Sequence, residues 1–255
     1  MGTSEMSGTK LWQEAIAFKD ILLRTKEQVS FQDWYPYDTL SNFFHLEDTF
    51  NQFPLSEIVA PGKRILDIGA ADGELAFFLE RLGYQTSIID HAPTNHNNLN
   101  GVKALAKAFD SKVQIIDFDI DSYSPINDVL PKDISITFLL GIHYHLKNPF
   151  LILDELAKRT KYLVFSTRIA RYSPRRYEMK RESLSYLLEE RELNNDPTNY
   201  WVFSQTALET LFNRTGFKVL KHEAIGDVKK SVPNDMNHDE RYFALLVSEK
   251  YEGGK

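Results

Sequence analysis

The chain has 255 residues, of which 42% are hydrophobic and 13% aromatic, so it is long enough to bury one large core. It contains no cysteine, which excludes disulfides, thiolate metal sites and a cysteine nucleophile. The net charge of −6 disfavours broad electrostatic attraction to nucleic acid, and no apolar run approaches the roughly 20 residues of a membrane-spanning helix. We therefore expect a cytoplasmic protein without membrane association.

Residues 1–60 are predicted to form a helical preface to the core. Residues 1–10 are small and polar, and we expect them to be disordered. Apolar residues then recur at roughly helical spacing from Leu11 to Val29, and a second short helix is predicted over Phe43 to Phe53. The aromatic, proline-interrupted stretch between them, Phe31 to Asp38, is predicted to be a loop.

The most informative segment of the sequence follows this preface, within residues 64–75. A short apolar strand carries Asp67 near its end, turns through Gly69 and Gly73, and enters a helix predicted over Glu74 to Leu82. Glycines let a backbone approach a ligand closely, and the start of a helix offers unpaired N–H groups. The spacing is G-x-x-x-G rather than the G-x-G-x-x-G of dinucleotide enzymes. With an acid before the turn, it favours a nucleoside that carries a cationic tail.

The next strand, Gln85 to Asp90, ends in a second acid. Asp90 stands where α/β nucleotide folds bind ribose hydroxyls, or alternatively forms a turn before the following proline. Further elements alternate along the chain: helices are predicted over 97–109 and 150–158, and strands over 113–118, 134–140 and 161–166. Strands separated by helices imply right-handed crossovers and a parallel sheet.

After these strands the alternating pattern breaks. Residues 168–199 are polar and helix-like with few core positions, and we interpret 168–203 as a lid or insertion on the substrate side. Between Arg168 and Arg181 stand six Lys or Arg residues and one Glu, either as a solvated helix face or as a site for an anion. A helix over 205–212 and two strands, 217–223 and 242–248, complete the core, which we place at 61–255.

The glycine turn and the second acid resemble the class I S-adenosylmethionine-dependent methyltransferases, whose first motif reads close to D/E-x-G-x-x-x-G. The resemblance implies an α/β, Rossmann-like fold with a seven-stranded sheet, an antiparallel last strand, and S-adenosylmethionine as cofactor. In the family pattern Asp67 and the glycines face the methionine part, Asp90 binds the ribose diol, and Asp119 and Ile120 contact the adenine, with Asp117 or Asp121 as alternatives. The cofactor-binding residues implied are Asp67, Gly69, Ala70, Ala71, Gly73, Asp90, His91, Asp119, Ile120, Leu140 and Gly141.

A narrower resemblance follows the strand at 134–140. Residues 141–149 are similar to the G-x-x-Y-H-x-x-x-P stretch of the tRNA wobble-uridine carboxymethyl-transferring family and its small-molecule relatives. Asn199 to Ser204, followed by a helix and Gly216-Phe217, resembles a substrate-side segment of the same relatives. The chain lacks the long N-terminal extension of the tRNA enzymes, and the cations that hold their carboxylated cofactor have no assignable counterpart. Plain methyl transfer is therefore expected.

The catalytic candidates lie in this same stretch: His143, Tyr144 and His145. An imidazole with a pKa of about 6.5 suits proton abstraction near neutrality, but either histidine could equally shape the loop. The i,i+2 spacing of the two histidines offers no third ligand, so no metal is predicted. The substrate-binding candidates are Trp34, Tyr35, Arg168, Arg175, Tyr200 and Trp201.

Together these patterns predict methyl transfer to an oxygen or nitrogen of a small, anionic molecule, such as a sugar or a natural-product intermediate. Two alternatives stay open. The basic residues after Arg168 could contact RNA in a tRNA-modifying methyl- or carboxymethyltransferase, although the net charge disfavours it. The chain could also be a non-catalytic, cofactor-binding partner subunit. The sequence does not indicate an oligomeric state.

Overall fold

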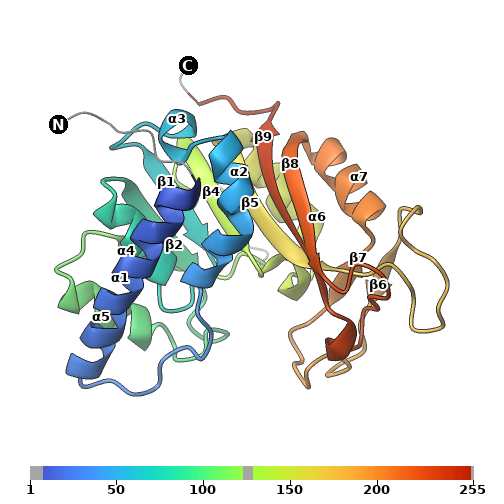
Figure 1. Ribbon diagram of the computed structural model, residues 1–255, viewed down its shortest axis with the longest axis horizontal. Coiled ribbons are helices and arrows are strands. Elements are labelled where there is room, and N and C mark those ends of the chain that lie inside the picture. Colours follow the sequence, from blue (N-terminus) through green and yellow to red (C-terminus); the bar gives the residue numbers. More distant parts are fainter. Residues whose placement is uncertain (1–7, 123–128, 254–255) are drawn as a thin grey trace. The chain divides into compact units, whose positions relative to one another are not determined.

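The computed structural model describes residues 8–122 and 129–253 (Figure 1). The chain divides into two compact units, residues 1–138 and 139–255. Of the ten residues expected to be disordered, 1–7 lie outside the described residues, whereas Gly8 to Lys10 form the start of the first helix. No described helix combines the length and the apolar character that crossing a membrane requires.

The first unit begins with helices, as the preface predicts. They are α1 (Gly8–Gln28), the 3-10 helix η1 (Leu40–Leu46), α2 (Glu47–Gln52) and α3 (Leu55–Ile58). α1 buries one stripe of apolar residues spaced three or four apart, from Leu11 to Leu22, and contacts α2 and η1. The single helix predicted over 43–53 is a 3-10 turn followed by a short α-helix, and α3 was not predicted.

The sheet of the first unit is parallel where its pairing is described. Its strands are β1 (Arg64–Ile68), β2 (Gln85–Asp90), β3 (Gln114–Asp117) and β4 (Ile134–Leu140), in the order β3-β2-β1-β4. The helices that follow β1 and β2 are α4 (Glu74–Arg81) and α5 (Asn100–Ala108), and α4 packs on β1 and β2. The register sets Asp67 opposite Ile88 and Asp90 opposite Asp117. The carboxyl ends of these strands therefore meet at one edge.

The second unit is built around a long strand. Its elements are the 3-10 helix η3 (His143–His145), α6 (Pro149–Arg159), β5 (Thr160–Ile169), β6 (Ser185–Leu187), β7 (Trp201–Phe203), α7 (Gln205–Thr215), β8 (Phe217–Gly226), the 3-10 helix η4 (Met236–His238) and β9 (Glu240–Ser248). β9 runs antiparallel to both β5 and β8, which confirms the predicted antiparallel end of the sheet.

The helix-like interpretation of residues 168–199 is wrong. The segment consists of turns and the short strand β6, which pairs with β7 at 201–203. Left-handed residues interrupt any helix there, among them Arg176, Arg191 and Asn194, with φ of 65°, 65° and 58°. The segment also buries a small core of its own, formed by Ala170, Leu188, Leu193 and Val202. The described strands thus include two, β6 and β7, beyond the seven predicted.

Candidate functional site

A tight turn joins β1 to α4 in the first unit. Gly69, Ala71 and Gly73 have φ of 71°, 53° and 78°, a left-handed conformation that disfavours side chains. The Gly73 amide donates to the Ala70 carbonyl at 2.8 Å, which closes the turn. A Cβ on Gly73 would lie 2.8 Å from the Val102 side chain. The sequence therefore needs glycine at 73, while Ala71 is held in a conformation that costs free energy.

Asp67 is a buried acid beside this turn. Asp67 is 4% exposed, and its carboxyl makes no hydrogen bond or ion pair within the described part of the chain. Burial, and to a lesser extent the charge of Asp90, raises its pKa to about 8. A buried carboxyl without a cation is costly, and such groups gather at functional sites. An ammonium group would supply the missing partner.

Asp90, by contrast, is well supplied with donors. Its Oδ2 accepts from the Ala71 amide at 3.1 Å and from Asn95 Nδ2 at 3.0 Å, and its Oδ1 accepts from the His91 amide at 2.8 Å. Burial raises the pKa of Asp90, while these hydrogen bonds act to lower it. The contacts fix the carboxylate against the glycine turn. Because a carboxylate has about four acceptor positions, one remains for a ligand hydroxyl.

The residues after β3 have more local roles. Asp117 Oδ1 accepts from the Ala92 amide at 2.9 Å, and Asp119 Oδ1 accepts from the Asp121 amide at 2.9 Å. Ile120 is half-buried beside them. The ring of His91 contacts the Thr94 hydroxyl within its own loop, at 3.2 Å. Asp117 and Asp119 thus order the loops at the edge where β2 and β3 end.

In the second unit, β4 ends at Leu140 and the loop after it begins with Gly141. Gly141 has a φ of 71°, and its amide donates to the Ser166 carbonyl of β5 at 3.0 Å. His143 follows and is fully buried, with its ring centroid 5.0 Å from Phe165 and 5.3 Å from Phe203.

His143 is a poor candidate for a base. Its two ring nitrogens have no hydrogen-bond partner among the described residues. Burial lowers its pKa to about 3, so the ring stays neutral inside an aromatic core. A base must reach the proton that it removes, and a fully buried ring does not. We therefore leave His143 out of the catalytic set.

The other predicted residues of the second unit contact this loop through one ring pair and through backbone carbonyls. The Tyr144 ring packs at a tilt against His145, with 4.2 Å between ring centroids, and the Tyr144 carbonyl accepts from the Tyr200 amide at 2.8 Å. Trp201 Nε1 donates to the Lys147 carbonyl at 3.3 Å. Sequence analysis missed Arg241 of β9, whose guanidinium lies 5.7 Å from the Tyr144 ring. No motif marks Arg241, because strand pairing alone brings it to this loop.

The contacts of His145 define its tautomer. Its Nδ1 lies 3.2 Å from the Thr198 carbonyl and 2.9 Å from the Thr198 hydroxyl, and that hydroxyl donates to Asp196 at 2.6 Å. Both Thr198 oxygens therefore accept, and Nδ1 carries the hydrogen. Burial lowers the pKa of His145, although Asp196 and Thr198 act to raise it. The ring is neutral at pH 7, with a lone pair on Nε2.

The basic run that begins at Arg168 is not one exposed surface. Arg168 is 2% exposed, pairs with Asp239 and donates to the Asp235 carbonyl at 2.6 Å. Arg171 pairs with the buried Glu240, with Nε 2.8 Å from Oε2. Arg175 is exposed. The expectation that Arg168 contacts substrate directly does not fit this burial, and its guanidinium serves the packing of β5 and β9 instead.

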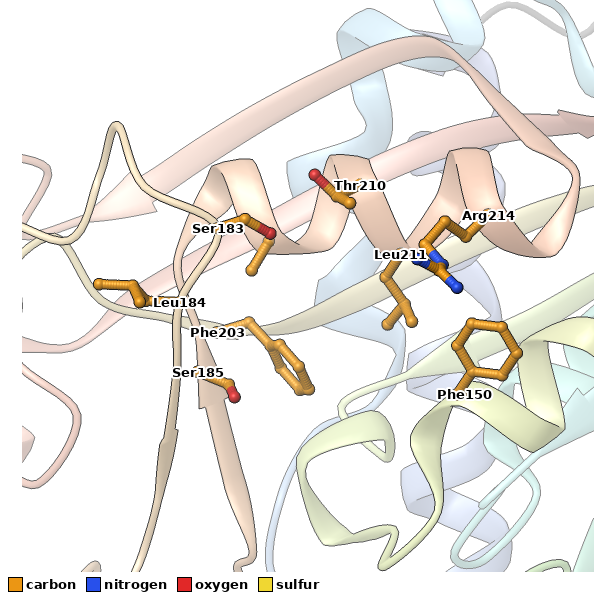
Figure 2. Close-up of a pocket in the computed structure, with 9 residues that line it drawn as sticks. Phe150, Ser183, Leu184, Ser185, Phe203, Thr210, Leu211 and Arg214 are labelled. Atoms are coloured by element: carbon orange, nitrogen blue, oxygen red, sulfur yellow. The ribbon is translucent and has the colours of Figure 1, made fainter.

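A hollow of 370 Å³ in the second unit lies apart from the predicted residues, none of which lines it. Figure 2 shows Phe150, Phe203 and Leu211 around it, with Arg214 at one end and the Ser183 and Ser185 side chains at the other. Most of these side chains are exposed, so the hollow is open to solvent.

The family model described as "Methyltransferase domain" matches residues 45–222, more than half of the chain. The chain belongs to this methyltransferase family. No curated protein sequence matches it significantly.

Solved structures share the methyltransferase fold at low identity. The N-terminal domain of EvdMO1 with SAH bound has a TM-score of 0.57 and 15% identity, over 91% of this chain and 97% of that one. The same domain in the presence of SAH and D-fucose gives 0.54 and 16%, over the same shares. The PH0226 protein from Pyrococcus horikoshii OT3 gives 0.54 and 14%, over 86% and 97%. At such identities the likeness shows the fold alone.

The cofactor of this methyltransferase is S-adenosylmethionine, and the first unit fits it. The turn has no side chain at Gly69 or Gly73, so a ligand can approach its backbone. Asp67 lacks a cation that an amino group would provide, and Asp90 retains an acceptor position for a ribose hydroxyl. The wobble-uridine branch suggested by residues 141–149 is not confirmed; membership of the broader family is.

Sequence analysis missed three side chains around this turn. Asp72, Asn95 and Asn97 are each half-buried or buried and each make several hydrogen bonds. The predicted helix over 97–109 included Asn97, but α5 starts later, at Asn100, so Asn97 lies in the loop before it. Their clustering directly after a strand end was the available signal.

Proposed function

We propose that this methyltransferase moves a methyl group from S-adenosylmethionine to an oxygen or nitrogen of a small molecule that carries an anionic group. The observation that carries the proposal is the cluster of contacts at the loop after β4. Tyr144 packs against His145, the Tyr200 amide donates to the Tyr144 carbonyl, and the guanidinium of Arg241, which also contacts Asp239, lies 5.7 Å from the Tyr144 ring. Such a cluster suits a ligand with a flat or apolar body and one negative charge.

The chain's contribution to the reaction is orientation and proton transfer. The cofactor supplies an electrophilic methyl group on a sulfonium, and the acceptor displaces it while the sulfur keeps the bonding electron pair. Holding the two reactants near attack distance supplies several kcal/mol in such reactions. The His145 Nε2 lone pair accepts the proton of an acceptor hydroxyl, and the Thr198 contacts keep Nδ1 protonated throughout.

The overall charge favours a small acceptor over RNA. An RNA-binding surface needs several exposed cations along one face, and the chain carries a net charge of −6. In the basic run, Arg168 and Arg171 are paired with Asp239 and Glu240, whereas Arg175, Arg176, Lys180 and Arg181 are exposed and could hold a small anion. A solved structure that shares this fold was determined in the presence of SAH and D-fucose, which is consistent with a sugar-like acceptor.

The test uses cofactor labelled in its methyl group, incubated with the full chain and two acceptor pools. One pool contains hydroxylated sugars and aromatic carboxylates, and the other contains total tRNA. We expect label in the small-molecule pool, lost in His145→Gln and retained in His143→Leu. Label in tRNA, with binding that falls steeply with salt, would establish the RNA alternative instead. Cofactor binding without transfer to any acceptor, including molecules that copurify, would favour the non-catalytic partner subunit.

A further inference from the structure

Residues 31–39, which we call the cap segment, have no regular secondary structure for most of their length, yet they are fixed to the cofactor turn. The segment joins α1 to η1 and carries the predicted substrate residues Trp34 and Tyr35. The Trp34 ring packs edge-on against Phe31 at 4.6 Å, and the Tyr35 ring packs edge-on against Tyr37 at 5.5 Å. A loop so placed needs partners for its backbone groups.

The first anchor is Asp72, inside the glycine turn. Its side chain is 1% exposed, and both of its oxygens accept hydrogen bonds from the protein itself rather than from a ligand. Oδ2 accepts from the Tyr35 amide at 2.7 Å, and Oδ1 accepts from Asn97 Nδ2 at 2.8 Å. A residue of the turn is therefore bonded directly to the backbone of the cap segment.

The second anchor is Glu74, the first residue of α4. Its Oε2 accepts from the amide and the hydroxyl of Thr39, at 3.2 Å and 2.9 Å. Its Oε1 accepts from Lys26 Nζ of α1 at 2.7 Å. The same ammonium lies 3.6 Å from Asp72 and 5.0 Å from the Trp34 ring centroid. Lys26 thus joins both acids to the cap segment.

The third anchor is Asn97, which comes from the loop after β2. Its Nδ2 also donates to the Asp33 carbonyl at 2.9 Å, and its Oδ1 accepts from the Gly101 amide at 3.0 Å. There is no room behind this amide: a Cβ on Gly101 would lie 2.1 Å from Asp72 Oδ1 and 2.6 Å from Asn97 Nδ2. The three anchors form one buried network around the carboxyl of Asp72.

We propose that Lys26, Asp72, Glu74 and Asn97 are positioning residues that couple the cap segment to the cofactor turn. Ala71, next to Asp72, is held at a φ of 53°, which persists only where the surroundings determine it. The network fixes the turn from the side of the cap segment, as Asp90 and Asn95 fix it from the side of β2. A turn fixed in this way binds its ligand without first having to be ordered.

Coupling of this kind is reciprocal. If an ordered cap segment favours cofactor binding, then cofactor binding must order the cap segment to the same extent. The amides of Tyr35 and Thr39 report directly on this order, because they are the donors to Asp72 and Glu74. The inference rests on the cofactor of the family and not on the proposed acceptor.

The experiment compares hydrogen exchange of the 31–39 amides with and without SAH, alongside the SAH dissociation constant. The variants are Lys26→Met, its conservative counterpart Lys26→Arg, Gly101→Ala and the control Arg24→Met. Arg24 is exposed on the same helix as Lys26. Alanine is the better helix former, so any loss in Gly101→Ala comes from its contact with Asp72 and Asn97.

We expect SAH to slow exchange of the Tyr35 and Thr39 amides in the wild type. Lys26→Met and Gly101→Ala should raise the SAH dissociation constant about tenfold and abolish this slowing, while Lys26→Arg and Arg24→Met behave as the wild type. Unchanged exchange on SAH binding, or unchanged affinity in both disruptive variants with β1 and β2 still protected, would overturn the inference. A wild-type protein that binds no SAH would overturn it together with the cofactor assignment.

Discussion

The buried carboxyl of Asp67 makes the stability of the cofactor-free protein depend on pH. Its pKa is about 8 in the fold against 3.8 for an exposed aspartate, so the unfolded chain releases this proton at lower pH than the folded one. The stabilisation is therefore complete below about pH 4 and is lost as pH rises to about 8. Within that window the folded state holds one proton more than the unfolded state, so the free energy of unfolding falls by about 1.36 kcal/mol per pH unit.

Asp67→Asn removes this titration. Between pH 5 and pH 7, the free energy of unfolding of the wild type should therefore fall by about 2.7 kcal/mol relative to that of the variant. The difference does not depend on the exact pKa of Asp67, provided that it lies above 7. Urea unfolding of both proteins at pH 5, 6 and 7, without cofactor, measures it. Stability curves that run parallel across this range would refute the buried, protonated Asp67.

Two further measurements make the result specific. Asp90→Asn removes the charge that is the second cause of the raised pKa, so its stability curve should flatten at a lower pH than that of the wild type. Asp67→Asn should also lose SAH affinity by about ten- to a hundredfold, because a neutral amide cannot form a charge-assisted hydrogen bond to the amino group. A carboxyl that binds a ligand is expected to lower the stability of the ligand-free protein and to be required for affinity.

Three other predictions concern the turn, the histidines and the buried arginine. His145→Gln should lower kcat by about a hundredfold or more with little change in SAH affinity, whereas His143→Leu should keep its kcat; equal losses in both would contradict the Nε2 assignment. Gly73→Ala, at a φ of 78° and in contact with its neighbours, should lose at least about 1–2 kcal/mol of stability together with SAH binding, by denaturation and calorimetry. Arg168→Met should destabilise by about 1–3 kcal/mol in urea because the Val232 and Asp235 carbonyls lose their charged donor, and a change well below about 1 kcal/mol would show that these contacts are not maintained.

Sequence patterns located the regular elements of the core well. The strands at 85–90 and 134–140 have the predicted bounds, because short apolar runs that end at Asp90 and before Gly141 are typical of buried strands. The glycine turn was predicted from its spacing, and the structure gives it the left-handed backbone that glycine allows. The N-cap at Ser204, whose hydroxyl accepts from the Ala207 amide at 3.0 Å, was not predicted, although a serine directly before a helix is a typical capping signal.

Features that depend on distant pairing could not be predicted in the same way. The burial of Arg168 follows from the approach of residues 235 and 239, more than sixty positions away. Arg241 reaches Tyr144 because β9 carries it there, and nothing in its own neighbourhood marks it. His143 and His145 are two residues apart in one 3-10 turn, so local sequence does not distinguish them. Tertiary packing buries the His143 ring, whereas it places Nδ1 of His145 against Thr198 and leaves a lone pair on Nε2.

The anchoring of the cap segment bears on where this protein can be shortened. The family match begins at residue 45, beyond the cap segment, so a chain trimmed to that boundary would look complete by homology. It would nevertheless lack Lys26 and the amides of Tyr35 and Thr39, leaving the Asp72 and Glu74 carboxylates short of donors. Repulsion between these two carboxylates would then disturb the glycine turn between β1 and α4, which binds the cofactor. Minimal catalytic fragments of this chain should for that reason include α1 rather than start where the family match begins.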